Sequence, residues 1–163
     1  MIRFENVVKR FDGREVLSGV SFEIAKGEVL AVVGPSGTGK SVLLKHLVRL
    51  LTPTSGRVWL DDVEISAATG DALEAVRARF GYLLEGGALL GWLTVAENVA
   101  LPLRERTRLA SAEIDARVAE ALAAVELAEA ADRYPAEISG GMQKRAGLAR
   151  AIVRRSDIVL YDE

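Results

Sequence analysis

The sequence predicts an α/β fold with a parallel sheet, and a strand, a glycine-rich loop, a helix and a second strand carry this prediction. Residues 28–33 form a continuous apolar run, typical of a strand that is buried on both faces. A glycine-rich loop follows at once, and residues 40–51 then repeat apolar side chains at helical spacing until Pro53. Residues 158–161 form a second apolar strand. Strand, loop and helix in this order are the unit from which parallel sheets are built.

An antiparallel hairpin is predicted ahead of this unit. Residues 2–11 and 15–24 are rich in β-forming side chains, and Asp12-Gly13 between them suits the positive φ angles of a tight turn. Ser111 is expected to cap the helix that it begins. The other elements expected from residue periodicity are strands at 57–60 and 80–84 and helices at 71–78, 111–127 and 139–154.

The composition excludes several classes of protein. The chain has 163 residues, half of them hydrophobic, which is enough for one sizeable core. Its 21 basic and 23 acidic side chains are interspersed, so charge gives no argument for a nucleic-acid partner. There are no cysteines for disulfides or thiolate metal sites. The apolar runs are too short to span a bilayer, and the first residues do not resemble a signal peptide, so a cytoplasmic protein is expected.

The glycine-rich loop matches the GxxxxGK[ST] pattern of a phosphate-binding loop. It reads Gly34-Pro35-Ser36-Gly37-Thr38-Gly39-Lys40-Ser41. The glycines let backbone N–H groups curl around phosphate oxygens, and the helix that follows directs its positive dipole end at the anion. Lys40 is expected to neutralise the β- and γ-phosphates of ATP, and Ser41 to bind Mg²⁺. A dinucleotide-binding loop is rejected because its glycine spacing differs. The segment therefore predicts a P-loop NTPase.

Two carboxylates follow the strand at 158–161. Asp162 and Glu163 are aimed at the carboxyl edge of the predicted sheet, the edge at which the phosphate-binding loop also lies. In that position Asp162 is expected to hold Mg²⁺ and Glu163 to orient or deprotonate the attacking water.

A further motif points to one family. Residues 138–145 read Ile-Ser-Gly-Gly-Met-Gln-Lys-Arg and precede the apolar strand with its two acids. Together with the phosphate-binding loop, this order resembles the ATP-binding cassette (ABC) family over essentially the whole chain. The resemblance implies a partial ABC ATP-binding domain over residues 1–163, with a Q-loop region and helical subdomain at about 85–138 inserted in the P-loop core.

The resemblance also implies partners and a composite site. Two ATPase subunits would face each other head to tail as a homodimer. Ser139, Gly140 and Gly141 of one subunit would then touch the γ-phosphate held by Lys40 of the other. Phe11 corresponds to the aromatic that stacks on adenine in this family, a role that an aromatic face suits. His46, the single histidine, lies too early in the chain to be the family's switch histidine.

Residues 82–90 and 93–103 are similar to lipid-transport cassettes of the Mla type, and the Met142–Arg145 end of the signature points the same way. This similarity implies a subunit that powers phospholipid movement through an integral membrane permease. It would lie on the cytoplasmic face of the bacterial inner membrane.

Two departures from the family pattern are expected to matter. Glu85 stands where the family has a glutamine that contacts Mg²⁺ and the attacking water, so it adds negative charge beside ATP and should reduce turnover. The sequence ends at Glu163, ahead of the family's D-loop and switch histidine. We therefore expect an incomplete catalytic domain, marginally stable by itself and with little or no hydrolysis.

The alternatives are a fragment that binds nucleotide without catalysis and an ABC ATPase for another transported substrate. An ABC protein of DNA repair or translation is disfavoured, because the chain has neither a long coiled-coil insertion nor a basic face. No nucleic-acid partner is expected.

Overall fold

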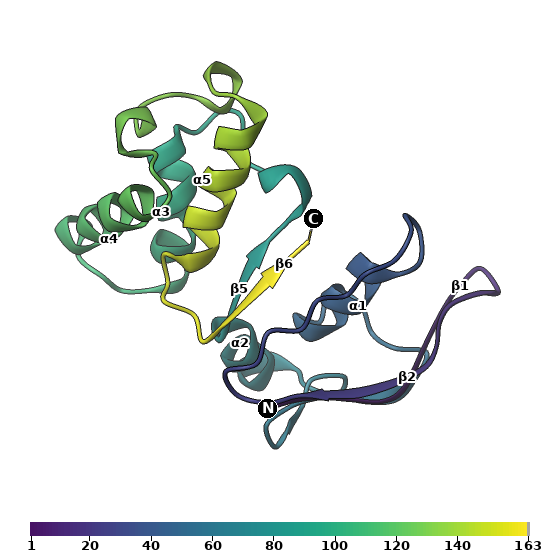
Figure 1. Ribbon diagram of the computed structural model, residues 1–163. Helices are drawn as coiled ribbons and strands as arrows, with labels where there is room; N and C mark the ends of the chain where they lie inside the picture. Colours follow the sequence, from purple (N-terminus) through teal and green to yellow (C-terminus); the bar gives the residue numbers. More distant parts are fainter. Residues whose placement is uncertain (163) are drawn as a thin grey trace. The chain divides into compact units, whose positions relative to one another are not determined.

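The computed structural model describes residues 1–162 and divides the chain into two compact units, Met1–Ala78 and Arg79–Glu163. Glu163 lies outside the described residues, so its predicted role in orienting water stays a prediction. The two units are described separately below (Figure 1).

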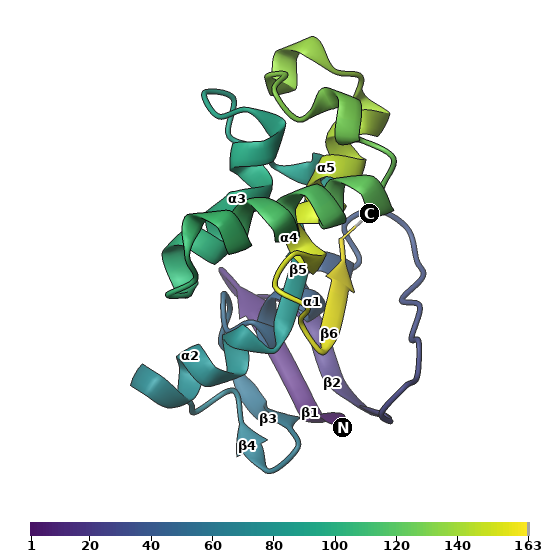
Figure 2. The same ribbon diagram turned by 90° about the vertical axis from the view of Figure 1, so that its left-hand side faces the viewer.

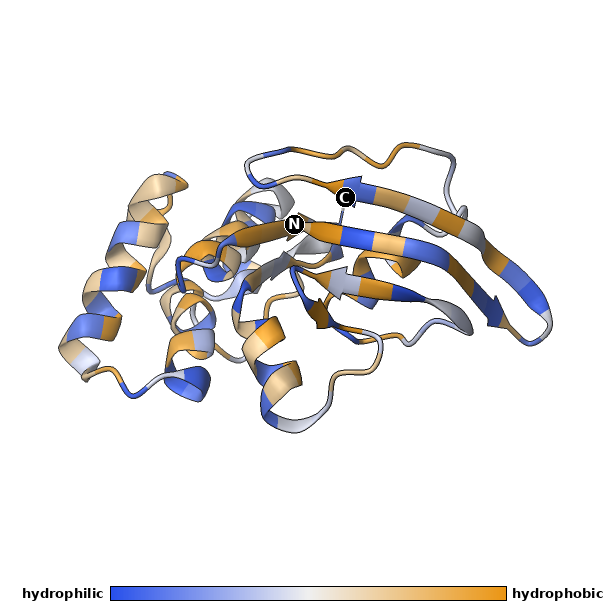
Figure 3. Ribbon diagram, turned by 90° about the horizontal axis from the view of Figure 1, so that it is seen from below, coloured by the Kyte–Doolittle hydropathy of each residue, from blue (hydrophilic) through white to orange (hydrophobic). Residues whose placement is uncertain are grey.

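The first unit contains a four-stranded antiparallel sheet in the order β2-β1-β3-β4 (Figure 2). Its strands are β1 (Ile2–Phe11), β2 (Arg14–Ile24), β3 (Ser55–Leu60) and β4 (Val63–Glu64). The β1–β2 hairpin is confirmed, because Asp12 and Gly13 have φ angles of 47° and 82°. Figure 3 shows hydrophobic residues alternating with hydrophilic ones along these strands, as expected of a sheet with one buried face.

Two helices complete the first unit, α1 (Lys40–Leu47) and α2 (Gly70–Ala78). Arg77 of α2 donates hydrogen bonds to the carbonyl oxygens of Val48 and Arg49, just after α1, at 3.0 and 3.4 Å. His46 is buried in α1 with Nδ1 2.6 Å from the carbonyl oxygen of Val42, and burial lowers the pKa of its imidazole. It is a core residue of this unit.

The apolar segment 28–33 differs from its prediction. It has no regular secondary structure, and Val29 and Val33 are 94% and 88% exposed. A strand is held by hydrogen bonds to its neighbours, and the antiparallel sheet of this unit is formed by β1 to β4 without this segment. The apolar residues of this segment favour a strand. Whether a strand forms also depends on a neighbouring strand with which the segment can exchange hydrogen bonds.

The second unit is built on a parallel pair of strands covered by helices. β5 (Phe80–Leu83) pairs with β6 (Ile158–Tyr161) so that Tyr82 is opposite Leu160 and Leu83 is opposite Tyr161. The helices are α3 (Val95–Arg106), α4 (Ser111–Ala124) and α5 (Gly140–Ile152), with short 3₁₀ turns η1 (Glu85–Gly87), η2 (Ala128–Ala130) and η3 (Pro135–Glu137).

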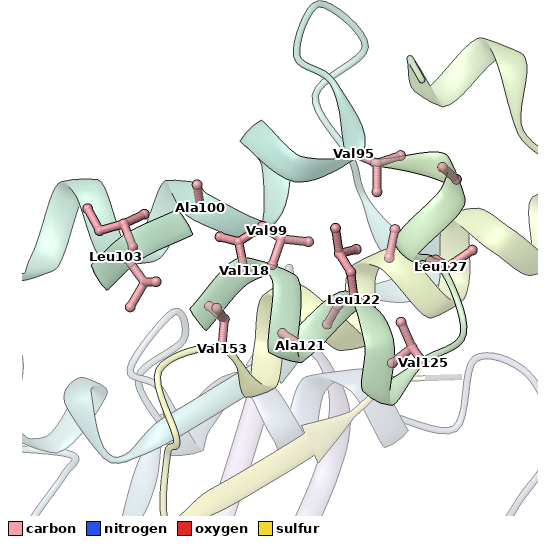
Figure 4. Packing of buried hydrophobic residues seen from close by; sticks show 14 of the residues in the cluster. Val95, Val99, Ala100, Leu103, Val118, Ala121, Leu122, Val125, Leu127 and Val153 are labelled. Carbon is pink, nitrogen blue, oxygen red and sulfur yellow. The ribbon is translucent and has the colours of Figure 1, made fainter. Parts of the chain in front are cut away.

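The core of the second unit lies among its three long helices. Figure 4 shows Val99 and Leu103 of α3 meeting Val118 and Leu122 of α4, and all four side chains are buried. Burying an aliphatic side chain of this size contributes roughly 1.5–3 kcal/mol. The helices therefore form one packed body that supports the loops at their ends.

Two local features of these helices differ from the sequence analysis. Ala110, not Ser111, occupies the N-cap of α4, because helical backbone geometry already begins at the serine. The helix α3 was not predicted at all. Its start carries a capping box, in which Thr94 Oγ1 accepts from the N–H of Glu97 and the Glu97 carboxylate accepts from the N–H of Thr94.

Candidate nucleotide-binding site

The phosphate-binding loop lies in the first unit and leads directly into α1. Gly39 caps the helix with a φ of 97°, and its carbonyl oxygen accepts from the N–H of Leu43 at 2.9 Å. The loop is exposed from Gly34 to Thr38. The backbone therefore changes from an exposed loop to a helix at Gly39, which leaves the amides of the first helical turn at the loop.

Backbone carbonyl groups of the loop hold the side chain of Lys40 over the loop. Its Nζ donates to the carbonyl oxygens of Gly34 and Pro35, each at 3.0 Å, and Thr38 Oγ1 donates to the same Pro35 oxygen at 2.9 Å. These bonds place a positive charge over the curled loop, where amide N–H groups and a cation together favour an anion. Such a loop can bind a phosphate chain.

Packing against β2 requires glycine at the end of the loop. A Cβ atom added at Gly39 would lie 3.0 Å from Cγ1 of Val16 and 3.2 Å from Cδ2 of Leu17, in a backbone conformation that L side chains rarely adopt. The loop is thus seated directly on β2 within the first unit. Ser41, the predicted Mg²⁺ ligand, follows Lys40 in the first turn of α1 and is half-buried.

Phe11, the predicted adenine-stacking residue, ends β1 and is 39% exposed. The ammonium of Lys9 lies 4.9 Å from the centre of its ring, a cation–π contact. Lys9 also donates to the carbonyl oxygen of Thr52 at 2.8 Å. The ring is accordingly held at the surface rather than in the core.

Asp162 lies in the second unit, directly after β6. Its side chain is 4% exposed, and its N–H continues the parallel ladder by donating to the carbonyl oxygen of Leu83 at 3.0 Å. The hydroxyl of Tyr82 donates to Asp162 Oδ2 at 3.0 Å. Burial, and then this hydrogen bond to a carboxylate, raises the pKa of the Tyr82 phenol. Tyr82 therefore remains a protonated donor at neutral pH.

The donor groups suit magnesium. Among residues 1–162 no group of three or more acidic or histidine side chains is arranged so that it could hold a metal ion. Ser41 and Asp162 offer one hydroxyl and one carboxylate, both oxygen donors of the kind that magnesium prefers. Magnesium typically takes one or two carboxylates and completes its shell with water and substrate phosphates, so the chemistry of each of these side chains, taken within its own unit, is compatible with Mg²⁺.

Glu85 opens the 3₁₀ turn η1 after β5 and is exposed. The turn is fastened to α5 by Arg150, whose guanidinium donates to the carbonyl oxygens of Gly87 and Ala88 at 2.7 and 3.0 Å. Gly87 has a φ of 83°, and an added Cβ there would lie 2.5 Å from the carbonyl oxygen of Gln143. The position of Glu85 is thus set by the packing of its turn on α5.

The signature residues begin α5 in the second unit. Ser139 is the N-cap and its Oγ accepts from the N–H of Met142 at 3.3 Å, which confirms the predicted helix start. Gly140 and Gly141 are exposed, and a Cβ added at Gly140 would meet nothing within 4 Å. Packing within the chain therefore leaves room for a side chain at position 140.

The side-chain amide of Asn98, which is buried, fixes the backbone of the loop that follows the η1 turn. Asn98 Nδ2 donates to the carbonyl oxygens of Leu90, Leu93 and Thr94, and its Oδ1 accepts from the N–H of Leu90. Trp92 lies within this loop and is 74% exposed. The loop therefore combines a fixed backbone with a large exposed apolar side chain.

A phosphate-binding loop at the start of one helix and a buried carboxylate at the end of a parallel strand define a nucleotide-binding protein of the P-loop class. The chain belongs to the ABC transporter family, because the family model described as "ABC transporter" matches residues 17–163. This membership confirms the family resemblance and the predicted α/β P-loop fold.

Relatives and solved structures agree with this assignment. The methionine import ATP-binding protein MetN of Xanthomonas euvesicatoria pv. vesicatoria (strain 85-10) is 44% identical over 167 residues, covering 100% of this chain and 50% of MetN. The probable ribonucleotide transport ATP-binding protein mkl of Mycobacterium leprae (strain TN) is 43% identical over 162 residues, covering 99% and 47%. The chain thus spans about half the length of the curated relatives it matches.

Among solved structures, the ATP-binding cassette MJ0796 matches with a TM-score of 0.89 and 32% identity. The match covers 98% of this chain and 72% of that chain, which was solved as a dimer in a post-hydrolysis state bound to ADP and Pi. A second dimeric structure of MJ0796 matches with a TM-score of 0.90 and 33% identity.

The structure also reveals three positions that the sequence analysis did not single out for a role: Tyr82, Asn98 and Arg150. Each acts through a contact with another segment. Asn98 had a local signal, since the Thr94–Glu97 capping box predicts a helix on which Asn98 faces back toward the loop. Tyr82 and Arg150 contact residues about 60 or more positions away, which no local pattern reports.

The packing of η1 on α5 predicts that neighbouring glycines tolerate alanine very differently. Gly86→Ala places a Cβ in open space and costs only the strain of a positive φ, about 1–2 kcal/mol of unfolding free energy. Gly87→Ala adds a clash with the backbone of Gln143, so its cost should be on the order of 3 kcal/mol or more. Chemical denaturation of both variants measures the difference. Equal losses would contradict the close contact between turn and helix.

Proposed function

We propose that this chain is the ATP-binding part of an ABC transporter subunit that hydrolyses ATP and drives an integral membrane permease. The orientation of Lys40 over the loop carbonyls of Gly34 and Pro35 carries the proposal, because it places a cation where the β- and γ-phosphates of ATP would bind. Mg²⁺, when bound with ATP, would neutralise charge on the phosphates as they react. Ser41 and Asp162 are the residues that would hold it.

The other site residues have distinct proposed roles. Gly34, Pro35, Ser36, Gly37, Thr38 and Gly39 form the loop whose amides would surround the phosphates. Phe11, exposed at the end of β1, would stack on the adenine ring. Glu163 would orient the attacking water, and Glu85 would contact that water or the metal.

A second subunit is proposed to complete the site. Packing within the chain leaves room for a side chain at position 140, and the N–H groups at the start of α5 suit an anion. An approaching phosphate from another molecule gives a reason for the small residues at Ser139, Gly140 and Gly141. MJ0796 was solved as a dimer, which supports a homodimer for this chain, and the head-to-tail arrangement follows from the family resemblance.

The permease is proposed to contact the loop around Trp92. This side chain is exposed on a loop whose backbone is fixed by Asn98, and tryptophan is enriched at the energetic centres of protein interfaces. None of the helices within residues 1–162 has the length and apolar character to cross a bilayer. On the family resemblance, we place this subunit beside the permease on the cytoplasmic face of the inner membrane.

Phospholipid is the proposed transported substrate. The support is the resemblance of residues 82–90, 93–103 and 142–145 to Mla-type cassettes. Methionine and ribonucleotides are the alternatives, since these are the substrates named for the relatives MetN and mkl.

Lys40→Ala tests the ATPase proposal. Loss of a cation at the phosphates should reduce ATP hydrolysis by the complete subunit about a hundredfold and weaken ATP binding, because the developing charge loses its main neutralising partner. Lys45→Ala removes the same charge later in α1 and serves as the matched control. Hydrolysis that survives Lys40→Ala as well as it survives Lys45→Ala would refute the proposed role of the loop.

Glu85→Gln tests the effect of the extra carboxylate. Removing one negative charge near the phosphates should strengthen ATP binding and raise turnover, by about 1 kcal/mol or roughly fivefold. Glu129→Gln, an exposed substitution of the same type in η2, is the control and should change neither quantity. Steady-state kinetics and nucleotide titrations measure both effects. An unchanged hydrolysis rate in Glu85→Gln would show that the carboxylate does not limit turnover.

The substrate is tested on the complete subunit assembled with its permease in detergent micelles. Added phospholipid is expected to stimulate ATP hydrolysis, while methionine and a ribonucleotide are not. Lys40→Ala in the same assembly should abolish the stimulation, which shows that it comes from this subunit. Stimulation by methionine or by the ribonucleotide without a response to phospholipid would assign the transporter to that substrate instead.

A further inference from the structure

Tyr82 and Asp162 join the two parallel strands of the second unit through their side chains as well as their backbones. In the ladder Leu83 is opposite Tyr161, and the N–H of Asp162 then bonds to the carbonyl oxygen of Leu83. Tyr82 precedes Leu83 on β5, and its hydroxyl donates to Asp162 Oδ2 at 3.0 Å. The carboxylate is thus fixed both at its backbone and at one oxygen.

Burial makes this hydrogen bond consequential. Asp162 is 4% exposed, so water has little access to take the place of the phenol. The terminal torsion of an aspartate side chain is broad, and without a donor its two oxygens can rotate over a wide range. A protonated phenol at one oxygen restricts that rotation and leaves the carboxylate with one preferred orientation.

We infer that Tyr82 is a positioning residue, whose hydroxyl orients the Asp162 carboxylate for Mg²⁺ bound with ATP. The inference rests on the proposed function, because it assumes that Asp162 binds the metal. Outer partners that hydrogen-bond to metal-binding carboxylates commonly set the metal affinity, and their loss costs about 10–100-fold. Tyr82 acts through Asp162 and needs no contact with the nucleotide.

The competing explanation is that the hydrogen bond only stabilises the pairing of β5 with β6. The two explanations predict different measurements. A purely structural bond changes the free energy of unfolding and leaves Mg²⁺ affinity alone. A positioning role changes Mg²⁺ affinity in the folded protein, whatever happens to stability.

Tyr82→Phe distinguishes them, because it removes one oxygen and keeps the ring. In the complete subunit, Mg²⁺ is titrated calorimetrically with a non-hydrolysable ATP analogue present. The apparent Mg²⁺ affinity should fall about tenfold, while binding of the analogue without Mg²⁺ should not change. In steady-state assays the loss should be recovered, at least in part, by raising the Mg²⁺ concentration.

Tyr161→Phe is the matched control. Tyr161 lies on β6 beside Asp162 and is exposed, so loss of its hydroxyl should leave the Mg²⁺ affinity unchanged. A double-mutant cycle adds an independent measurement. In an Asp162→Asn background, Tyr82→Phe should have little further effect on Mg²⁺ affinity, because the carboxylate that it positions is already gone.

The outcomes separate the inference from the function on which it rests. Wild-type Mg²⁺ affinity in Tyr82→Phe, with or without a loss of stability, would overturn the positioning role while leaving the ATPase proposal intact. Additive effects of Tyr82→Phe and Asp162→Asn would overturn it too. A wild-type subunit that binds no Mg²⁺ with the ATP analogue would overturn the proposed function and the inference with it.

Discussion

The close approach of α5 to the backbone of β5 and the η1 turn is the contact on which the second unit depends. A Cβ added at Gly81 would strike the carbonyl oxygen of Ala151, and one added at Gly147 would lie 2.7 Å from Cα of Gly87. At Gly81 and Gly147 the backbone of the helix therefore comes close to the backbone of the strand and the turn. Because Ser139 caps α5 and Gly140 begins it, the signature residues and the Glu85 turn belong to one tightly packed body.

The parts of the fold that the sequence predicted well are those decided by near neighbours. Asp12-Gly13 adopts the positive φ angles that the hairpin requires. Ser139 caps α5 by accepting a hydrogen bond from the N–H of Met142, three residues later. The phosphate-binding loop is likewise identified from eight consecutive residues, and Lys40 within it donates hydrogen bonds to carbonyl oxygens of the same loop. In each case the residues that set the geometry are adjacent in the chain.

The parts that were missed depend on which segments meet. The apolar run at 28–33 has the composition of a buried strand, yet strand formation needs a partner that composition does not name. α3 was not predicted, although the capping box at its start is a sufficient signal; the helix contains Pro102, a residue that helix interiors usually exclude. Of the candidate site, the residue types were predictable, whereas the supports of Asp162 and Glu85 by Tyr82 and Arg150 arise from folding.

The four hydrogen bonds made by the Asn98 amide have a thermodynamic consequence for any molecule that binds Trp92. Association normally loses free energy by ordering loops and side chains at the contact surface. Here the backbone around Trp92 is already ordered, so that entropy is lost when the subunit folds and not when a partner arrives. When a partner displaces such a rigid loop, α3 moves with it, because Asn98 is itself a residue of that helix.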